Sequence, residues 1–157
     1  MNVGQPSVSV LLPVYNGAAY LEQAVQSILD QTYGYFELIV INDGSTDESS
    51  SIIERFKDAR IRLYNQQNQG LAASLNHAVE LSKGKYLARQ DQDDVSFPQR
   101  FEKQVRFLES HPRCGMVGTW TSIWVQDRPT ERAHRHPAGD LDIKFDLLFD
   151  NPLCTAQ

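Results

Sequence analysis

The sequence predicts an α/β fold, with a mainly parallel, Rossmann-like sheet flanked by helices. Over the first 110 residues, apolar runs of strand length alternate four times with amphipathic helical patterns. This alternation is typical of parallel sheets whose strands are joined by right-handed crossovers. The chain has 157 residues, of which 41% are hydrophobic. That size suits a single globular domain, which we expect to cover residues 1–157.

The first strand and helix are predicted within residues 7–31. Residues 7–12 (SVSVLL) form a continuous apolar and β-branched run, as in a strand that is buried in a parallel sheet. Residues 13–17 (PVYNG) predict a turn. Residues 18–31 predict an amphipathic helix, because apolar side chains recur there with helical spacing: Leu21, Val25, Ile28 and Leu29.

The second and third units repeat this pattern. Residues 36–41 (FELIVI) predict a strand, and Ser45 and Glu48 have the spacing of a capping box for the helix that follows. Residues 61–64 predict a third, shorter strand. Gly84 follows a third helix, at a position that suits a left-handed residue. The two helices are indicated by their apolar side chains: Ile52, Ile53 and Phe56 in one, and Leu71, Leu75, Ala78 and Val79 in the other.

The fourth predicted strand, residues 86–90, is followed by carboxylates at three of four positions: Asp91, Asp93 and Asp94. Carboxylates crowded at the end of a buried strand repel one another and lose hydration, and a divalent cation commonly offsets both costs. A fourth helix is expected over residues 98–110. Ser96 and Gln99 have the spacing of its capping box, and Asp94 is expected to serve as a negative charge at its N-terminus.

Beyond residue 110 the pattern is less regular. Residues 116–125 are rich in Thr, Val, Ile and Trp and predict a strand or a strand pair. Residues 127–139 are polar with two prolines and predict a mobile loop. Residues 141–149 predict a last helical segment. Because no closing helix or polar tail precedes Gln157, we expect the chain to be the N-terminal part of a longer protein.

The bulk composition excludes several classes of function. The net charge of −5 gives no basic surface for non-specific binding of nucleic acid. The two cysteines, Cys114 and Cys154, lack the spacing of a zinc site or a disulfide framework, and we expect Cys114 to be a small buried residue. The N-terminus has no signal sequence or membrane span. We therefore expect a cytoplasmic protein, with peripheral attachment to the inner face of the membrane left open.

Ligands of open α/β sheets bind beyond the carboxyl ends of the strands, where this sequence places three polar loops. Tyr15, in the first, offers an aromatic face for stacking on a base. Asp43, in the second, can accept hydrogen bonds from a base or a ribose. Asp91 and Asp93, in the third, can share a hard cation that neutralises a diphosphate. Both Gly-rich phosphate motifs, GxxxxGK[ST] and GxGxxG, are missing, so an acidic site of this kind requires a bridging metal to bind a diphosphate.

Three segments resemble the N-terminal half of family 2 glycosyltransferases of the GT-A, or nucleotide-diphospho-sugar transferase, fold. They are SVSVLLPVYNG, FELIVINDGSTDES and NQGLAASLNHAVELSKGKYLARQDQDDVSFPQRFEKQV, in that order. The resemblance implies inverting transfer of a sugar from a nucleotide diphosphate, with a UDP-sugar as the expected donor. It also implies Mg²⁺ or Mn²⁺ as cofactor and a saccharide or lipid-linked acceptor, in cell-surface polysaccharide biosynthesis.

The resemblance also implies roles for individual residues. Pro13, Tyr15 and Asn16 match the turn that lines the base, and Asp43 matches the aspartate that contacts the base or ribose. Asp91 and Asp93 match the DXD pair: Asp93 is expected to hold the metal, and Asp91 to bind the ribose or join the metal's ligands. Gln92 departs from the alanine that is frequent between them. The nucleotide-sugar part would cover residues 7–110 and an incomplete acceptor part residues 111–157, with the catalytic base expected beyond Gln157.

Other interpretations explain less of the sequence. The acidic cluster alone fits a solvated helix N-terminus, but not the two other polar loops. A calcium loop ending at Glu102 is excluded, because Ser96 stands where that loop needs glycine. His134 and His136 lack a partner at metal-ligand spacing. Two alternatives stay open: a nucleotide- and metal-binding module without turnover, and a phosphotransferase with an aspartyl nucleophile.

Overall fold

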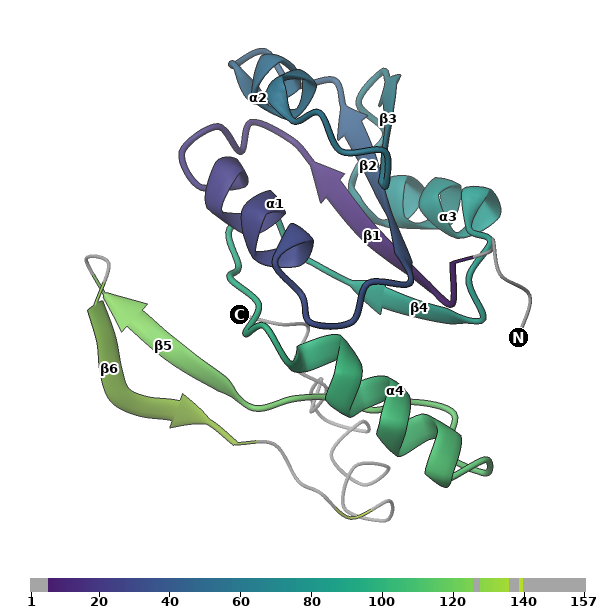
Figure 1. The fold of residues 1–157 in the computed structure, drawn as a ribbon. Helices are drawn as coiled ribbons and strands as arrows, with labels where there is room; N and C mark the ends of the chain where they lie inside the picture. The colour runs from purple at the N-terminus through teal and green to yellow at the C-terminus, as the bar shows by residue number, and fades with distance from the viewer. Residues whose placement is uncertain (1–5, 126–127, 136–138, 140–157) are drawn as a thin grey trace.

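The computed structural model of the chain describes residues 6–125, 128–135 and 139. Four parallel strands form one sheet in the order β3-β2-β1-β4 (Figure 1). They are β1 (Val8–Val14), β2 (Phe36–Asp43), β3 (Ile61–Gln66) and β4 (Tyr86–Arg89). The helices are α1 (Leu21–Leu29), α2 (Ser49–Arg55), α3 (Leu71–Leu81) and α4 (Arg100–Ser110). The predicted α/β fold and its four strand–helix units are confirmed.

The sheet separates two apolar layers, because successive strand residues point to opposite faces. Val8, Val10 and Leu12 of β1 pack with side chains of α1, α2 and α4. Leu11 packs on the other face, where Ala78 of α3 is fully buried. In Figure 1, α3 accordingly lies on the opposite side of the sheet from α1. All residues of β1 and β2 are buried, as the continuous apolar runs predicted.

Strand β1 is longer than the sequence predicted, since Pro13 and Val14 continue it instead of forming a turn. Pro13 pairs with Ile41 of β2, whereas β4 pairs only with the first four residues of β1, Val8 to Leu11. Pro13 therefore lies where β1 has a single neighbour, so its missing N–H does not interrupt a ladder on both sides.

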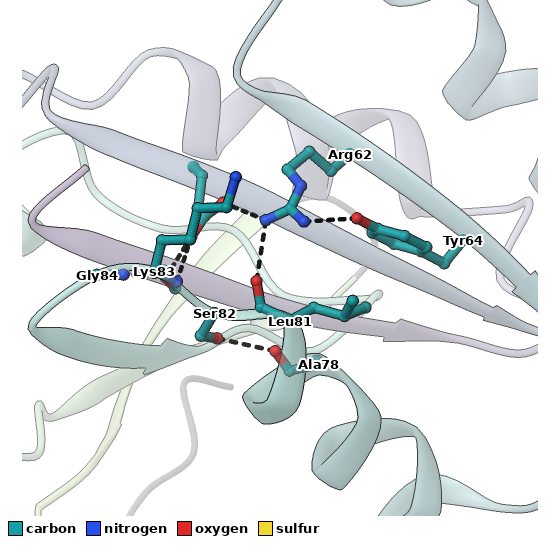
Figure 2. Close-up of polar contacts among 9 residues, drawn as sticks. Arg62, Tyr64, Ala78, Leu81, Ser82, Lys83 and Gly84 are labelled. Atoms are coloured by element: carbon teal, nitrogen blue, oxygen red, sulfur yellow. Dashed lines mark hydrogen bonds and ion pairs between the residues drawn. The ribbon is translucent and has the colours of Figure 1, made fainter. Parts of the chain in front are cut away.

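A polar network joins the sheet to the α3–β4 connection. The Glu37 carboxylate accepts hydrogen bonds from the Ser9 hydroxyl (2.7 Å), the Lys83 backbone N–H (2.8 Å) and Arg62 Nη1 (2.5 Å). Figure 2 shows the Arg62 guanidinium reaching the Leu81 carbonyl (3.0 Å) and the Tyr64 hydroxyl (2.6 Å) as well. Glu37, Ser9 and Arg62 therefore each have several partners, which is the condition for a stabilising network.

Gly84 ends the α3–β4 connection, but not in the left-handed conformation predicted for it, since the positive-φ glycines are Gly44 and Gly70. Its N–H donates to the Ser9 hydroxyl at 2.8 Å. A Cβ at Gly84 would lie 2.6 Å from the Ser9 backbone nitrogen. The position needs glycine because the connection crosses β1 too closely for a side chain.

Both predicted capping boxes are wrong, because the hydroxyls of their serines bind groups other than the backbone N–H groups at the helix start. Ser45 Oγ accepts a hydrogen bond from the Asn16 N–H at 3.0 Å, and α2 begins four residues later with no side-chain cap. Ser96 Oγ donates to Gln90 Oε1 at 2.7 Å, and α4 begins only at Arg100. Tertiary hydrogen bonds have replaced the local caps that the spacing indicated.

The segment after α4 also differs from the prediction. Strand β5 (Thr121–Val125) pairs antiparallel with β6 (Arg128–His134) in a separate two-stranded sheet. Most of the predicted loop 127–139 is therefore strand. Cys114 is only partly buried, and its thiol donates to the Met116 carbonyl at 3.0 Å. The predicted helix 141–149, His136 and Cys154 lie outside the described residues. Within the described ranges, no helix has the length and apolar character needed to cross a bilayer.

Candidate nucleotide site

A cavity of about 510 Å³ opens at the carboxyl ends of β1, β2 and β4, where ligands of open parallel sheets bind. It has the size of a small-molecule site. Its lining residues come from four parts of the chain: Pro13, Val14 and Tyr15; Asp43; Asn68, Gly70, Leu71 and Ser74; and Arg89, Asp91, Gln92, Asp93 and Asp94. Five of the six residues predicted for the site thus line one cavity. Asn16 is not among the lining residues.

The turn after β1 is held by side chains through four successive backbone N–H groups. Tyr15 N–H donates to Gln92 Oε1 at 2.9 Å. The next three N–H groups each donate at 3.0 Å to side chains of the β2–α2 segment: Asn16 to Ser45 Oγ, Gly17 to Ser49 Oγ, and Ala18 to Asp47 Oδ2. The Tyr15 side chain is 49% exposed beside the cavity. The fixed backbone therefore presents an accessible aromatic ring.

The Asn16 side chain serves this turn instead of the cavity. Its Oδ1 accepts a hydrogen bond from the Thr46 N–H at 2.8 Å. Asn16 has a φ of 51°, in the left-handed region that asparagine tolerates better than most residues. Its place in the structure is that of a turn residue linking β1 to the β2–α2 segment. The predicted contact of Asn16 with a nucleotide stays a prediction.

Asp43 is 3% exposed and is surrounded by donors of the chain. Its Oδ1 accepts from Gln66 Nε2 (2.7 Å) and the Gln69 N–H (2.9 Å), and its Oδ2 accepts from the Gly70 N–H (2.8 Å). Burial alone would raise the pKa of Asp43, but these hydrogen bonds outweigh it and hold the pKa below its usual value. Asp43 therefore stays ionised and oriented at the floor of the cavity.

The β3–α3 loop contributes a wall of the cavity that the sequence analysis did not assign. Asn68 and Gly70 of this loop line the cavity, together with Ser74 of α3. Gly44, with a φ of +76°, lies so near this loop that a Cβ there would be 2.9 Å from the Asn68 backbone nitrogen. A signal was present in the sequence, since a polar loop ending at a glycine precedes the third predicted helix. Its contact with Asp43 depends on the fold, however.

In the acidic loop, Arg89 fixes Asp91 through two hydrogen bonds. Arg89 Nε donates to Asp91 Oδ1 at 2.9 Å, and Nη2 donates to Oδ2 at 3.0 Å. This bidentate pair orients the carboxylate at the cavity wall. Arg89 thus helps to hold the shape of the acidic loop.

Gln90 holds the same loop through hydrogen bonds of its side-chain amide. The sequence did not predict this role. Its side chain is fully buried. Gln90 Nε2 donates to the carbonyls of Asp91 (3.2 Å) and Asp94 (2.8 Å), while Oε1 accepts from Ser96 Oγ (2.7 Å) and Arg100 Nη1 (2.8 Å). One amide thus connects the acidic loop to the start of α4. A glutamine between a strand and an acidic run carries no sequence signal for this role.

Asp94 is not the helix charge that the sequence predicted. It is only 7% exposed and lies six positions before the first residue of α4. Its Oδ2 is buried with no hydrogen-bond partner among the described residues. Burial, together with the nearby carboxylates of Asp91 and Asp93, raises its pKa to about 7. At this orphaned acceptor, the positive charges of Arg100 and Arg89 do not offset burial and the neighbouring carboxylates.

Asp93, in contrast, is exposed at the cavity wall. The described residues include no preassembled group of three His, Cys, Asp or Glu side chains able to hold a metal. Mg²⁺ and Mn²⁺ do not need such a cage, since they are commonly held by one or two carboxylates with waters and substrate phosphates. The hard oxygens of Asp93 and Asp91, with the uncompensated charge near Asp94, fit that kind of site.

Comparisons with known proteins agree on one family. The model of "Glycosyl transferase family 2" matches residues 9–155. Among curated relatives, the putative glycosyltransferase EpsE of Bacillus subtilis is 47% identical over 123 residues, covering 76% of this chain and 44% of EpsE. The putative teichuronic acid biosynthesis glycosyltransferase TuaG of the same organism is 36% identical, covering 78% of this chain and 50% of TuaG. The chain spans less than half the length of the first curated relatives it matches.

Solved structures show the same fold. Staphylococcus aureus TarS 1-349, in complex with UDP-GlcNAc, matches with a TM-score of 0.65 at 22% identity, over 80% of this chain and 37% of that one. The mannosyltransferase PcManGT of Pyrobaculum calidifontis, in complex with GDP-Man and Mn²⁺, matches with a TM-score of 0.63 at 25% identity, over 78% of this chain and 36% of that one. The predicted GT-A fold is confirmed.

Proposed function

Because the chain belongs to glycosyl transferase family 2, we propose that its cavity binds a nucleotide-diphosphate sugar together with Mg²⁺ or Mn²⁺. The whole protein would transfer the sugar, with inversion, to a hydroxyl of a saccharide or lipid-linked acceptor during polysaccharide synthesis. One observation carries the proposal: a single cavity joins an exposed tyrosine, an oriented aspartate and an acidic wall with an orphaned carboxylate oxygen. The donor and Mn²⁺ named for PcManGT and the polymer named for TuaG support it.

Uridine fits the base side of the cavity better than guanosine does. An ionised carboxylate offers about four acceptor positions. Hydrogen bonds from Gln66, Gln69 and Gly70 occupy three of those on Asp43, and the Ser74 hydroxyl also interacts with this carboxylate. At most one remains. Uracil presents one N–H between two carbonyls, whereas guanine presents two neighbouring donors that suit an unoccupied carboxylate. Together with stacking on Tyr15, this favours a UDP-sugar donor.

The residues of the acidic wall have separate roles in the proposed reaction. Asp93 and Asp91 hold the cation, and Arg89 keeps Asp91 in place. When bound, the cation supplies Lewis-acid stabilisation of the leaving diphosphate. Both oxygens of Asp91 accept a hydrogen bond from the cationic Arg89, which lowers the nucleophilicity of the carboxylate and disfavours the alternative in which Asp91 is a phosphotransferase nucleophile. Each oxygen keeps a further lone pair for the cation. We assign the general base that deprotonates the acceptor to none of the described residues.

Calorimetric titration with UDP and GDP, each with and without Mn²⁺, tests the proposal. We expect Mn²⁺ to tighten UDP binding at least tenfold, UDP to bind more tightly than GDP, and Asp93→Ala to abolish the effect of Mn²⁺. Glu80→Ala removes an exposed carboxylate of α3 and is the matched control, which should bind like wild type. Equal UDP binding by wild type and Asp93→Ala in Mn²⁺ would contradict the metal assignment.

Turnover is measured separately, by release of sugar from a panel of UDP-sugars. The chain covers less than half of its first curated relatives, so binding without sugar release would favour the module without turnover for this chain. Release that depends on Mn²⁺ and on Asp93 would favour the enzyme.

A further inference from the structure

We propose that Gln92 is a positioning residue that couples the base side of the cavity to its acidic side. The inference rests on the proposed function and extends it to a residue for which neither the sequence nor the family predicted a role. Gln92 lies between Asp91 and Asp93 in the acidic loop and lines the cavity. Its side chain crosses to the turn after β1, 77 positions away in sequence.

The Gln92 amide makes a paired contact with the backbone of Tyr15. Gln92 Oε1 accepts from the Tyr15 N–H at 2.9 Å, and Nε2 donates to the Tyr15 carbonyl at 3.2 Å. Both backbone polar groups of one residue are thus bound by both ends of one amide. Two bonds of this kind restrict the two peptide planes that flank the Cα of Tyr15, and with them the direction of its ring.

This contact begins where the backbone connection between β1 and β4 ends. Strand β4 pairs with Val8 to Leu11, and a last backbone hydrogen bond runs from the Gln90 N–H to the Leu11 carbonyl at 3.0 Å. Farther along, β1 continues without β4. The Gln92 side chain then takes the place of a ladder pair at Tyr15, so the two loops stay joined as far as the cavity.

The turn after β1 is shaped to accept this side chain. A Cβ at Gly17 would lie 2.4 Å from Gln92 Oε1 and 2.6 Å from its Cδ. The nearest atoms that it would meet all belong to the Gln92 side chain. An alanine at position 17 would therefore meet the glutamine side chain first and displace it, which gives a second way to break the same contact.

The base side and the acidic side of the cavity are coupled because different segments bind different parts of the turn after β1. The β2–α2 segment binds the N–H groups of Asn16, Gly17 and Ala18, whereas the acidic loop binds Tyr15 through Gln92. A ligand that orders the acidic loop therefore also orders the backbone that carries the Tyr15 ring. By thermodynamic linkage, a base on Tyr15 and a cation with diphosphate at the acidic loop each favour the other's binding. The contact lies at the exposed edge of the cavity, so water can replace it and its loss costs little stability.

The experiment separates the two halves of the ligand. Uridine is titrated into the protein with and without saturating Mn²⁺ and inorganic pyrophosphate, and the ratio of the two dissociation constants measures the coupling. We expect a ratio of about 10 for wild type, within the usual range of coupling between sites. Gln92→Met keeps the length of the side chain but loses both hydrogen bonds, and we expect its ratio to fall to about 1. The ratio is taken within each variant, so a change in the affinity for either ligand alone does not enter it.

Two further variants make the result specific. Gly17→Ala, with Gln92 intact, should lower the ratio in the same way. Gln23→Met changes an exposed glutamine of α1 and should keep the wild-type ratio. An unchanged ratio in both Gln92→Met and Gly17→Ala would overturn the coupling and leave the proposed function standing. Wild-type protein that bound neither uridine nor Mn²⁺ with pyrophosphate would overturn the proposed function itself.

Discussion

Glu37 and Asp94 are both buried carboxylates next to the same parallel sheet, but the chain treats them in opposite ways. Glu37, 6% exposed, accepts hydrogen bonds from a hydroxyl, a backbone N–H and a guanidinium. Asp94, 7% exposed, keeps a buried oxygen without a partner among the described residues. Glu37 lies next to the α3–β4 connection, whereas Asp94 lines the cavity.

The pKa values of Glu37 and Asp94 shift in opposite directions because only Glu37 has enough hydrogen-bond and ionic partners. Burial would raise the pKa of Glu37, but Ser9, Lys83 and Arg62 together lower it below its usual value. At Asp94, burial and the carboxylates of Asp91 and Asp93 raise the pKa to about 7, against the weaker effect of two arginines. A buried charge that the chain satisfies stabilises the fold. A buried charge that it leaves unsatisfied costs stability, and such sites are candidates for ligand binding.

The largest effect is expected from Glu37→Ala. The change leaves the Arg62 guanidinium beside a partly buried gap and removes the acceptor for Ser9 Oγ and the Lys83 N–H. Breaking a buried ion pair in this way costs about 3 kcal/mol in the free energy of unfolding. Urea denaturation at pH 7 measures it. A loss below about 1 kcal/mol would show that the network is not structural.

Glu37→Gln is the sharper control, because it keeps the size and removes only the charge. A carboxylate with a lowered pKa stabilises the fold above its ordinary pKa of about 4.5, and this contribution is lost as the pH falls through the folded-state pKa. The difference in stability between wild type and Glu37→Gln should therefore be largest near pH 7 and shrink below pH 4. A difference that does not vary with pH would exclude the charge as its cause.

Asp94→Asn should have the opposite sign. Its pKa of about 7 lies above the ordinary value of 3.8, so the ionised carboxylate destabilises the folded state increasingly from pH 4 to pH 7. The penalty is fully present above pH 7 and absent below pH 4. We expect Asp94→Asn to raise the free energy of unfolding by about 1–2 kcal/mol at pH 8, and to give no gain at pH 4. Denaturation at pH 4 and pH 8 measures this difference. A lower free energy of unfolding for Asp94→Asn than for wild type at pH 8 would contradict the contrast between Asp94 and Glu37.

The fold was predictable because the patterns that indicate strands and helices involve residues that are close together in the sequence. Apolar runs and helical spacing indicated all four strands and four helices of the parallel unit, and the order of strands and loops placed Tyr15, Asp43, Asp91 and Asp93 at one edge. What each polar side chain binds was not predictable in the same way. Ser45, Ser96 and Asp94 had the spacing of helix-terminal residues, yet each is engaged or buried through packing with distant segments.

Long-range hydrogen bonds explain the remaining misses. The donors that bind Asp43 come from Gln66, Gln69 and Gly70, and Gln92 meets Tyr15 across 77 positions. A single sequence does not show which glutamine amide will reach which backbone group. The carboxylates that line the cavity were therefore predictable from the sequence, whereas the glutamines that hold their loops in shape were visible only in the structure.

The smallest effect on stability is expected at Asp93, and this separates it from both buried carboxylates. Its side chain is exposed, so Asp93→Asn should change the free energy of unfolding by less than about 0.5 kcal/mol without metal. A ligand that binds only the folded state, at 100 times its dissociation constant, stabilises that state by about 2.7 kcal/mol. Wild type should gain about this much from UDP with Mn²⁺ at that concentration, and Asp93→Asn little of it. If Asp93→Asn is less stable without ligand, Asp93 belongs with Glu37 among the structural carboxylates. If Asp93→Asn loses only the stabilisation by ligand, Asp93 is a ligand of the cation.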